Sequence, residues 1–87
     1  MAKIWIPATM QTYADGQETV EAQGSTVYNL VDSLGRDYPQ LLDALLEDGE
    51  LRKGIAVAVD GYITSMGLYQ RVKDHSDVQF VPAIGGG

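Results

Sequence analysis

Cysteine is absent from this chain of 87 residues, and tryptophan and histidine each occur only once. The lack of cysteine excludes disulfides, a cysteine nucleophile and an iron–sulfur cluster bound by thiolates. The single histidine, His75, has no second imidazole with which to hold a metal ion, so we interpret it as a solvated turn residue. The stability of the folded chain must therefore come from the packing of its side chains.

Long apolar runs and positive charge are also scarce. No stretch approaches the roughly 20 residues that a membrane-spanning helix needs, and the N-terminus lacks the basic and apolar segments of a secretory signal peptide. Six basic residues against twelve acidic ones give a net charge of -6, which repels the phosphates of a nucleic acid. We therefore expect a cytoplasmic protein that binds neither nucleic acid nor membrane, and whose partners present basic surfaces.

The chain nevertheless has enough apolar residues to fold. A hydrophobic content of 45% over 87 residues supports one modest core, but the length is too short for a catalytic domain with a deep cleft. We expect one small binding or carrier module.

Alternating apolar residues predict two β-hairpins and a last strand. Residues 3–7 and 19–22 form the first hairpin, whose long loop contains the Asp15-Gly16 turn signal. Residues 55–59 and 62–64 form the second around Asp60-Gly61. A final strand follows at residues 78–81.

One main helix is predicted over residues 26–36. The Gly24-Ser25-Thr26 segment supplies a hydroxyl that can accept a hydrogen bond from a free N–H of the first turn. Tyr38-Pro39 ends this helix, because the residue before proline avoids the helical region. A short second helix ends at Gly49, and residues 65–76 are mostly a connection. The apolar residues at helical spacing are Val27, Leu30, Val31 and Leu34, then Leu41, Leu42, Leu45 and Leu46.

This order of elements predicts an α+β chain with the β-grasp fold, in which a mixed sheet of four to five strands wraps one main helix. The first and last strands then lie side by side and parallel in the middle of the sheet. We place the β-grasp domain at residues 1–82 and a flexible C-terminal tail at residues 83–87, where the sequence ends in Gly85-Gly86-Gly87.

Several short motifs follow one another in a characteristic order. They are Ile4-Trp5-Ile6-Pro7, Gly16-Gln17 with Val20, Gly24-Ser25-Thr26-Val27, Tyr38-Pro39 with Leu41 and Leu42, Val59-Asp60-Gly61, Asp74, and Phe80-Val81-Pro82-Ala83-Ile84 before Gly86-Gly87. With these motifs nearly the whole chain resembles the MoaD/ThiS family of ubiquitin-like sulfur carrier proteins. Its first third is most similar to the CysO-like branch that serves cysteine biosynthesis. The chain departs from the family at His75, where glycine is common, and in the additional Gly85.

The resemblance implies that Gly87 is the reactive residue. An E1-like adenylating enzyme of the MoeB/ThiF type would use ATP to adenylate its carboxyl, and a sulfur donor would convert the adenylate to a thiocarboxylate. The sulfur would pass to a cysteine synthase or to the large subunit of molybdopterin synthase, of which this chain would be the small subunit. The chain would itself bind no cofactor and would be a protein co-substrate, not an enzyme.

The tail and one face of the sheet are the candidate partner contacts. Gly86 and Gly85 would allow the tail to thread into a narrow active site, because glycine adopts any φ. Trp5 and Val81 alternate with the apolar residues of the opposite face, Ile4, Ile6, Val78 and Phe80, and we expect them to be neighbours on adjacent central strands. Together with Pro82 and Ile84 they form the predicted docking surface, an apolar patch with an acidic rim.

Other interpretations remain open. The activated Gly87 suits equally a ubiquitin-like modifier that is joined to lysines of target proteins, and a plain β-grasp interaction module would give the glycines no role. Trp5 would be a core residue if the strand alternated in the opposite phase. The acidic residues Asp43, Glu47, Asp48 and Glu50 are interpreted as a solvated face and not as a cation site, because no calcium-loop spacing is present.

Overall fold

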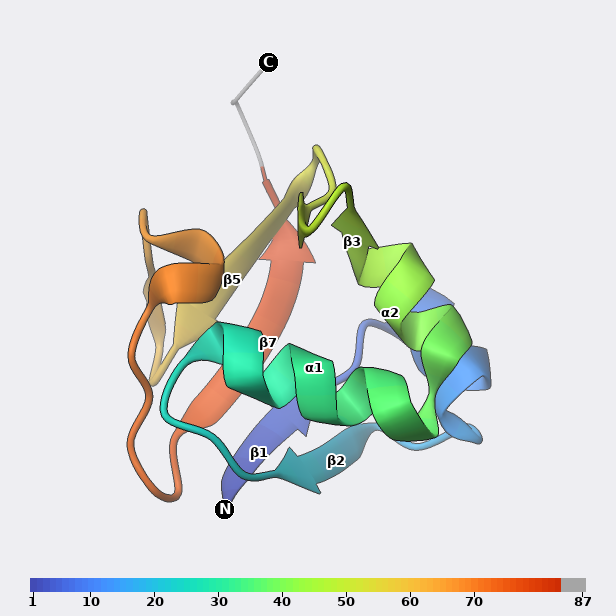
Figure 1. Cartoon of the computed structure of the whole chain (residues 1–87), viewed down its shortest axis with the longest axis horizontal. Coiled ribbons are helices and arrows are strands. Elements are labelled where there is room, and N and C mark those ends of the chain that lie inside the picture. Colours follow the sequence, from blue (N-terminus) through green and yellow to red (C-terminus); the bar gives the residue numbers. More distant parts are fainter. Residues whose placement is uncertain (84–87) are drawn as a thin grey trace.

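A five-stranded mixed sheet wraps around helix α1 in the computed structural model, which describes residues 1–83 (Figure 1). The strand order is β2-β1-β7-β5-β6; β1 and β7 are parallel neighbours at the centre and the other pairs are antiparallel. The strands are β1 (Ala2–Trp5), β2 (Thr19–Ala22), β5 (Ile55–Val59), β6 (Tyr62–Ile63) and β7 (Asp77–Pro82). The predicted β-grasp fold is therefore confirmed, including its central parallel pair.

Helix α1 (Val27–Asp37) lies within one residue of its predicted bounds. Thr26 caps its first turn, and the Thr26 hydroxyl accepts a hydrogen bond from the Asn29 N–H at 3.2 Å. The four apolar residues at helical spacing are all buried, as predicted: Val27, Leu30, Val31 and Leu34.

Helix α2 (Pro39–Leu45) starts one residue after Tyr38, the residue that closes α1. Proline is well suited to the first turn, where its missing N–H would have no partner inside the helix. Gly35 does more than weaken the end of α1. A Cβ atom at this position would lie 2.7 Å from Leu42 Cδ2, so glycine permits the two helices to pack closely.

The predicted helix stop at Gly49 is wrong. Helix α2 already ends at Leu45, and β3 (Leu46–Glu47) and β4 (Glu50–Leu51) then form a small antiparallel hairpin. Asp48 and Gly49 have positive φ values of 55° and 79°, the left-handed conformation at both turn residues that favours a two-residue hairpin.

Two segments predicted as connections contain short 3-10 helices. The loop of the first hairpin forms η1 (Ala8–Ala14), which is held by a hydrogen bond from the Gln11 amide to the Ile6 carbonyl at 3.1 Å. The connection before the last strand forms η2 (Gly67–Tyr69), where Leu68 is buried. Helices this short contain too few turns to produce a clear apolar period.

The turn between β5 and β6 also fixes the start of β7. The Asp60 carboxylate accepts hydrogen bonds from the Ser76 hydroxyl at 3.0 Å and from the Asp77 N–H at 2.9 Å. We call these two bonds the Asp60 clamp. His75, in the adjacent turn, has a φ of 68°, so histidine adopts here the positive φ that the family's glycine would adopt.

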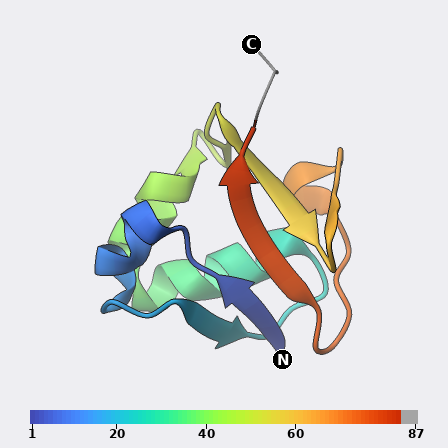
Figure 2. The same ribbon diagram turned by 180° about the vertical axis from the view of Figure 1, so that it is seen from behind.

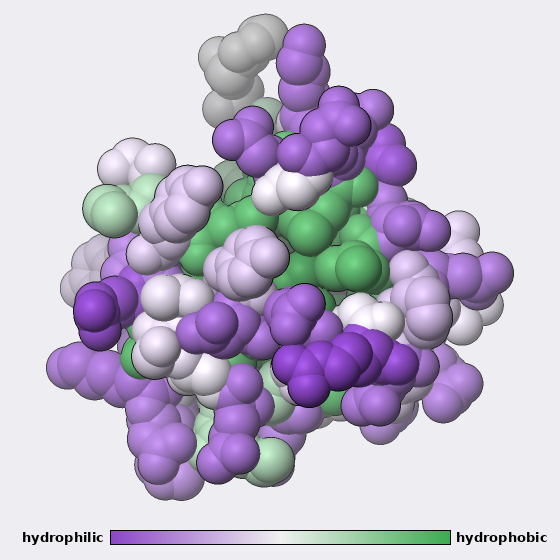
Figure 3. Space-filling view, in the orientation of Figure 1, coloured by the Kyte–Doolittle hydropathy of each residue, from purple (hydrophilic) through white to green (hydrophobic). Residues whose placement is uncertain are grey.

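The core lies between α1, α2 and the inner face of the sheet. Figure 3 views the molecule from the helix side, where apolar residues are visible between α1 and the β3–β4 hairpin and hydrophilic residues surround them. Within residues 1–83, no helix is both long enough and apolar enough to cross a membrane. The largest fully buried side chains are Ile4, Val27, Leu30, Val31, Leu41, Leu45, Val57 and Val78.

Candidate functional site

The candidate docking surface lies on the face of the sheet that the helices leave uncovered (Figure 2). Strands β1 and β7 pair with Ile4 opposite Val78 and Trp5 opposite Gln79. Because successive side chains of a strand point to opposite faces, Ile4 and Val78 enter the core while Trp5, Gln79 and Val81 face outward. The predicted phase is confirmed: Ile4 and Val78 have no exposed surface, and Trp5 is 38% exposed.

Trp5 and Val81 share this face but are not direct neighbours. The register sets Trp5 beside Gln79, and Val81 lies two residues further along β7, opposite Ala56. They are therefore diagonal neighbours on adjacent central strands and not directly opposite residues.

A row of outward residues instead crosses four strands. Gln79 lies between Trp5 and Ala58, and Ala58 pairs with Ile63 on β6. The row therefore has a bulky apolar side chain at each end, Trp5 and Ile63, and Ile63 is 68% exposed. With strands about 4.8 Å apart, these ends are separated by roughly 14 Å. We call this surface the outer face; it consists of Trp5, Gln79, Ala58 and Ile63 and of the next row, Val81 and Ala56. Ala58 points to this face but is only 6% exposed.

The position of Trp5 is fixed by its polar neighbours. The indole N–H donates a hydrogen bond to Asp77 Oδ1 at 3.2 Å, and Lys3 Nζ lies 5.7 Å from the centroid of the ring, within the range of a cation–π contact. The rim next to Trp5 therefore contains both an acid and a base, whereas the prediction described it as acidic. An ordered aromatic side chain with a mixed polar rim suits protein recognition.

The strand that leads to the tail ends beside a small apolar groove. The Ala83 N–H donates to the Gly54 carbonyl at 2.9 Å, which holds the last described residue of the chain against the start of β5. The groove has a volume of about 200 Å³ and is lined by Pro7, Thr9, Met10, Gly54, Ile55, Phe80, Val81 and Pro82. It lies next to the point where the predicted tail begins.

The other predicted site residues fall into two groups. Pro82 pairs with Ile55 and so belongs to the inward phase of β7, but it is exposed because the strand has passed the core there. Ile84, Gly85, Gly86 and Gly87 lie outside the described residues. Their predicted roles in docking, threading and reaction remain predictions.

Sequence reasoning missed Ile63 and the two alanines of the outer face. The signal was present, because a two-residue Asp60-Gly61 turn pairs Val59 with Tyr62 and hence Ala58 with Ile63. Large and small residues already alternate along β5, so that the small ones face outward.

No metal site is formed by the residues that the structure describes. Within 1–83, no three His, Asp or Glu side chains gather closely enough to hold an ion. His75 is exposed in its turn, next to Asp74. A hydrogen bond from the Met1 amino group at 3.0 Å, the charge of that group and the nearby His75 lower the pKa of Asp74.

Comparison with known proteins extends this description. The sequence profile of the ThiS family matches residues 4–87. The chain belongs to the ThiS family. Its fold and this family together identify a ubiquitin-like sulfur carrier protein, and members of the family are small protein carriers, not catalysts. No curated protein sequence matches the chain significantly.

Solved structures agree with the family. A chain of the crystal structure of the Amycolatopsis orientalis BexX/CysO complex matches with a TM-score of 0.89 and 28% identity over 100% of both chains. CysO of Mycobacterium tuberculosis, described as an antigen, matches with a TM-score of 0.87 and 24% identity over 97% of this chain and 100% of that chain. Small archaeal modifier protein SAMP1 of Haloferax volcanii matches with a TM-score of 0.72 and 26% identity over 99% and 98%.

Proposed function

We propose that this ThiS-family chain carries sulfur as a thiocarboxylate at Gly87 and delivers it in a biosynthetic pathway. The observation that carries the proposal is the position of the strand that precedes the tail: β7 is the central strand of the sheet, contributes Gln79 and Val81 to the outer face and ends at Pro82, directly before the predicted tail in the sequence. A partner that binds the outer face would therefore lie close to the point where the predicted tail begins.

The chemistry requires activation of the Gly87 carboxylate. The carboxylate oxygen attacks the α-phosphorus of ATP in an E1-like adenylating enzyme of the MoeB/ThiF type, and pyrophosphate leaves. Sulfide (HS⁻) supplied by a donor then attacks the acyl carbon, AMP leaves with the carboxylate oxygen to which it was joined, and loss of the S–H proton gives the thiocarboxylate. The resulting thiocarboxylate has a nucleophilic sulfur, whereas the original carboxylate is a poor nucleophile at neutral pH.

The tail glycines suit this role. A narrow active site must admit the tail as an extended backbone, and Gly85 and Gly86 have no side chain that would obstruct it. Ordering a free tail costs about 1–2 kcal/mol per residue, so we assign most of the binding energy to the outer face, with Trp5 as its anchor and Val81, Pro82 and Ile84 leading into the tail.

Cysteine biosynthesis is the pathway that we favour. A chain of the Amycolatopsis orientalis BexX/CysO complex is 28% identical to this chain over their full lengths, and that structure supports the idea that such a carrier docks on a second protein. The partners would be the adenylating enzyme and a cysteine synthase. Molybdopterin synthesis, with the chain as the small subunit of the synthase, is the other sulfur-accepting pathway.

An adenylation assay tests the proposal and the docking face together. The full chain, ATP and the adenylating enzyme of the same organism should give an adduct of AMP on Gly87, seen by intact-protein mass spectrometry, and pyrophosphate exchange. Gly86→Val should abolish both signals. Trp5→Ala should raise the KM for the carrier about tenfold or more, while Tyr28→Ala, which removes a more exposed aromatic side chain from α1, should leave it unchanged.

A protein modifier is the second candidate function. It is favoured by the likeness to SAMP1 of Haloferax volcanii, a small archaeal modifier protein, at 26% identity. Both functions begin with the same adenylate, so the assay above does not separate them. They differ in the group that displaces AMP, which is a sulfur atom in a carrier and a lysine amine in a modifier.

A further inference from the structure

An exposed apolar patch lies at the edge of the sheet, where β6 leads into η2. Tyr62, Ile63, Met66 and Tyr69 are 80%, 68%, 56% and 72% exposed; we call these four residues the edge patch. Tyr62 and Ile63 are consecutive residues of β6 and point to opposite faces of the sheet, so the edge patch wraps around the edge strand. An aromatic side chain buries about 150–250 Å², and the edge patch offers roughly 500 Å² in all around this edge. So large a patch on so small a chain indicates an interaction surface.

The edge patch forms a ridge with a hollow on each side. One hollow, of about 530 Å³, is lined by Tyr62, Ile63 and Met66 together with Lys73. The other, of about 350 Å³, is lined by Met66 and Tyr69 together with Glu50. Met66 lines both hollows and therefore lies on the ridge between them.

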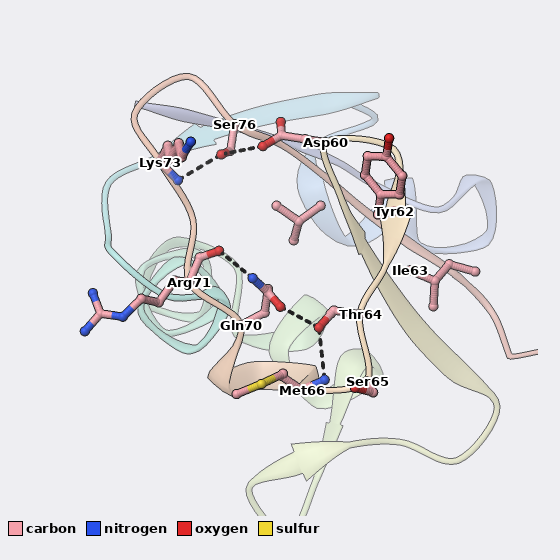
Figure 4. Close-up of a pocket in the computed structure, with 11 residues that line it drawn as sticks. Asp60, Tyr62, Ile63, Thr64, Ser65, Met66, Gln70, Arg71, Lys73 and Ser76 are labelled. Carbon is pink, nitrogen blue, oxygen red and sulfur yellow. Dashed lines mark hydrogen bonds between the residues drawn. The ribbon is translucent and has the colours of Figure 1, made fainter.

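The two hollows have opposite charges at their far rims. Arg71 and Lys73 line the first together with Asp60, whose carboxylate already accepts the two bonds of the Asp60 clamp, and Glu50 of the β3–β4 hairpin lines the second. Figure 4 shows Lys73 and Met66 at opposite ends of the first hollow, with the hairpin beyond Met66. Among residues 1–83 the ion pairs join other groups, so the charged side chains of Arg71, Lys73 and Glu50 have no partner there.

The polar residues of the first hollow already satisfy one another. Thr64 and Gln70 are hydrogen-bonded through their side chains, and the Ser76 hydroxyl donates to Asp60 (Figure 4). Among the described residues no buried side-chain polar atom lacks a partner. Apart from the cationic side chains of Arg71 and Lys73 at its rim, the hollow thus offers few free polar groups, and its apolar ridge and charged rim together suit a protein surface.

We propose that the edge patch is the interface of a twofold-symmetric dimer of this chain. An apolar ridge with cations on one side and an acid on the other is complementary to itself, because a twofold rotation places the cationic rim of one copy over the acidic rim of the other. In such a dimer, Lys73 and Arg71 of each copy face Glu50 of the other, and the two apolar ridges meet along the axis. This inference does not depend on the proposed function.

The size of the patch predicts a weak dimer. Stable interfaces bury about 800 Å² on each partner, which exceeds the roughly 500 Å² of the edge patch, and each copy has a net charge of -6 that opposes association. We therefore expect a dissociation constant above about 1 μM, with the paired rims providing the specificity.

Sedimentation equilibrium of the full chain between about 10 μM and 1 mM tests the proposal. The average mass should rise toward that of a dimer as the concentration increases. A mass that stays at the monomer value over the whole range would overturn the proposal and would leave the edge patch to a different protein.

Charge-reversal variants test whether the dimer forms through the edge patch. Lys73→Glu and Glu50→Lys should each weaken the dimer about tenfold or more, and an equimolar mixture of the two variants should regain it, because each interface then again pairs opposite charges. Lys53→Glu makes the same change of net charge at a residue that lines neither hollow and should not weaken the dimer comparably. Equal weakening by Lys53→Glu, or a mixture that remains monomeric, would contradict the assignment.

Discussion

The two faces of the central strands are built from alternate residues of the same short segments, yet they differ in what they hold. On the inner face, Ile4 and Val78 have no exposed surface and pack in the core. On the outer face, Trp5 is 38% exposed and is held by Asp77 and Lys3 at the surface. The inner residues therefore determine whether the sheet forms, and the outer residues are free to determine what it binds.

The largest effect is expected from a truncation on the inner face. Ile4→Ala removes a fully buried side chain from the central strand, and such cavities cost about 2–5 kcal/mol. Urea denaturation followed by circular dichroism measures the loss. Trp5→Ala, one residue further on the same strand, should cost about half as much or less, because Trp5 is partly exposed. Equal losses at both positions would remove the distinction between the two faces.

The Asp60 clamp should have the next largest effect, because it anchors β7, the strand that supplies both faces. Asp60→Ala removes two hydrogen bonds, to Ser76 and to Asp77 N–H, at an expected cost of about 1–2 kcal/mol. Asp60→Asn keeps a side-chain carbonyl as an acceptor and tolerates the positive φ of 51°, so it should cost less in the same denaturation experiment. A loss in Asp60→Asn as large as that in Asp60→Ala would argue against the clamp.

Gly35 tests the packing of the helices that cover the inner face. Alanine is favoured over glycine inside a helix by about 1 kcal/mol, but its Cβ would lie 2.7 Å from Leu42 Cδ2. Gly35→Ala should therefore fail to stabilise the natural protein. In the Leu42→Ala background, which removes Cδ2 but keeps the Cβ at 3.1 Å, the substitution should be more favourable than in the natural protein, by at most about 1 kcal/mol. If the substitution has the same effect in both backgrounds, the close contact has no energetic weight.

The smallest effect concerns Asp74, at the surface and away from both faces. The Met1 amino group donates a hydrogen bond to it and, with His75, lowers its pKa below the usual 3.8. A carboxylate whose pKa is lowered by folding stabilises the folded state above its unfolded pKa, and this contribution is lost as the pH falls through the lower, folded value. The melting temperature of Asp74→Asn should thus lie slightly below that of the natural protein near neutral pH, and the difference should disappear as the pH falls below the usual pKa of 3.8 and through the lower, folded pKa. A constant difference over this range would contradict the pairing.

Much of the fold could be predicted because its strongest signals are local. Four apolar residues at helical spacing and a hydroxyl cap are sufficient for α1, and alternation in the first and last strands separates Trp5 from Ile4. The Asp48-Gly49 turn was misread because glycine after an apolar helical run is equally typical of a helix end and of a hairpin.

The site was predicted less completely because it depends on register. Which residue of β7 lies beside Trp5 is decided by the long connection between the parallel strands and by the Asp60 clamp, and neither is visible in the pattern of the strands themselves. Alternation could place Trp5 and Val81 on one face of adjacent strands, but only the register shows that Gln79 lies directly beside Trp5. The roles of Gly85, Gly86 and Gly87 came from the resemblance to sulfur carriers, and they remain predictions.

The mass of the C-terminal peptide from the protein isolated from its native host tests the central proposal most directly. We predict that part of the population has one sulfur in place of one oxygen at Gly87, and that alkylation of the thiocarboxylate with iodoacetamide traps it there. A terminus that contains only oxygen, together with branched peptides in which Gly87 is joined to lysines of other proteins, would contradict the sulfur carrier and support the modifier.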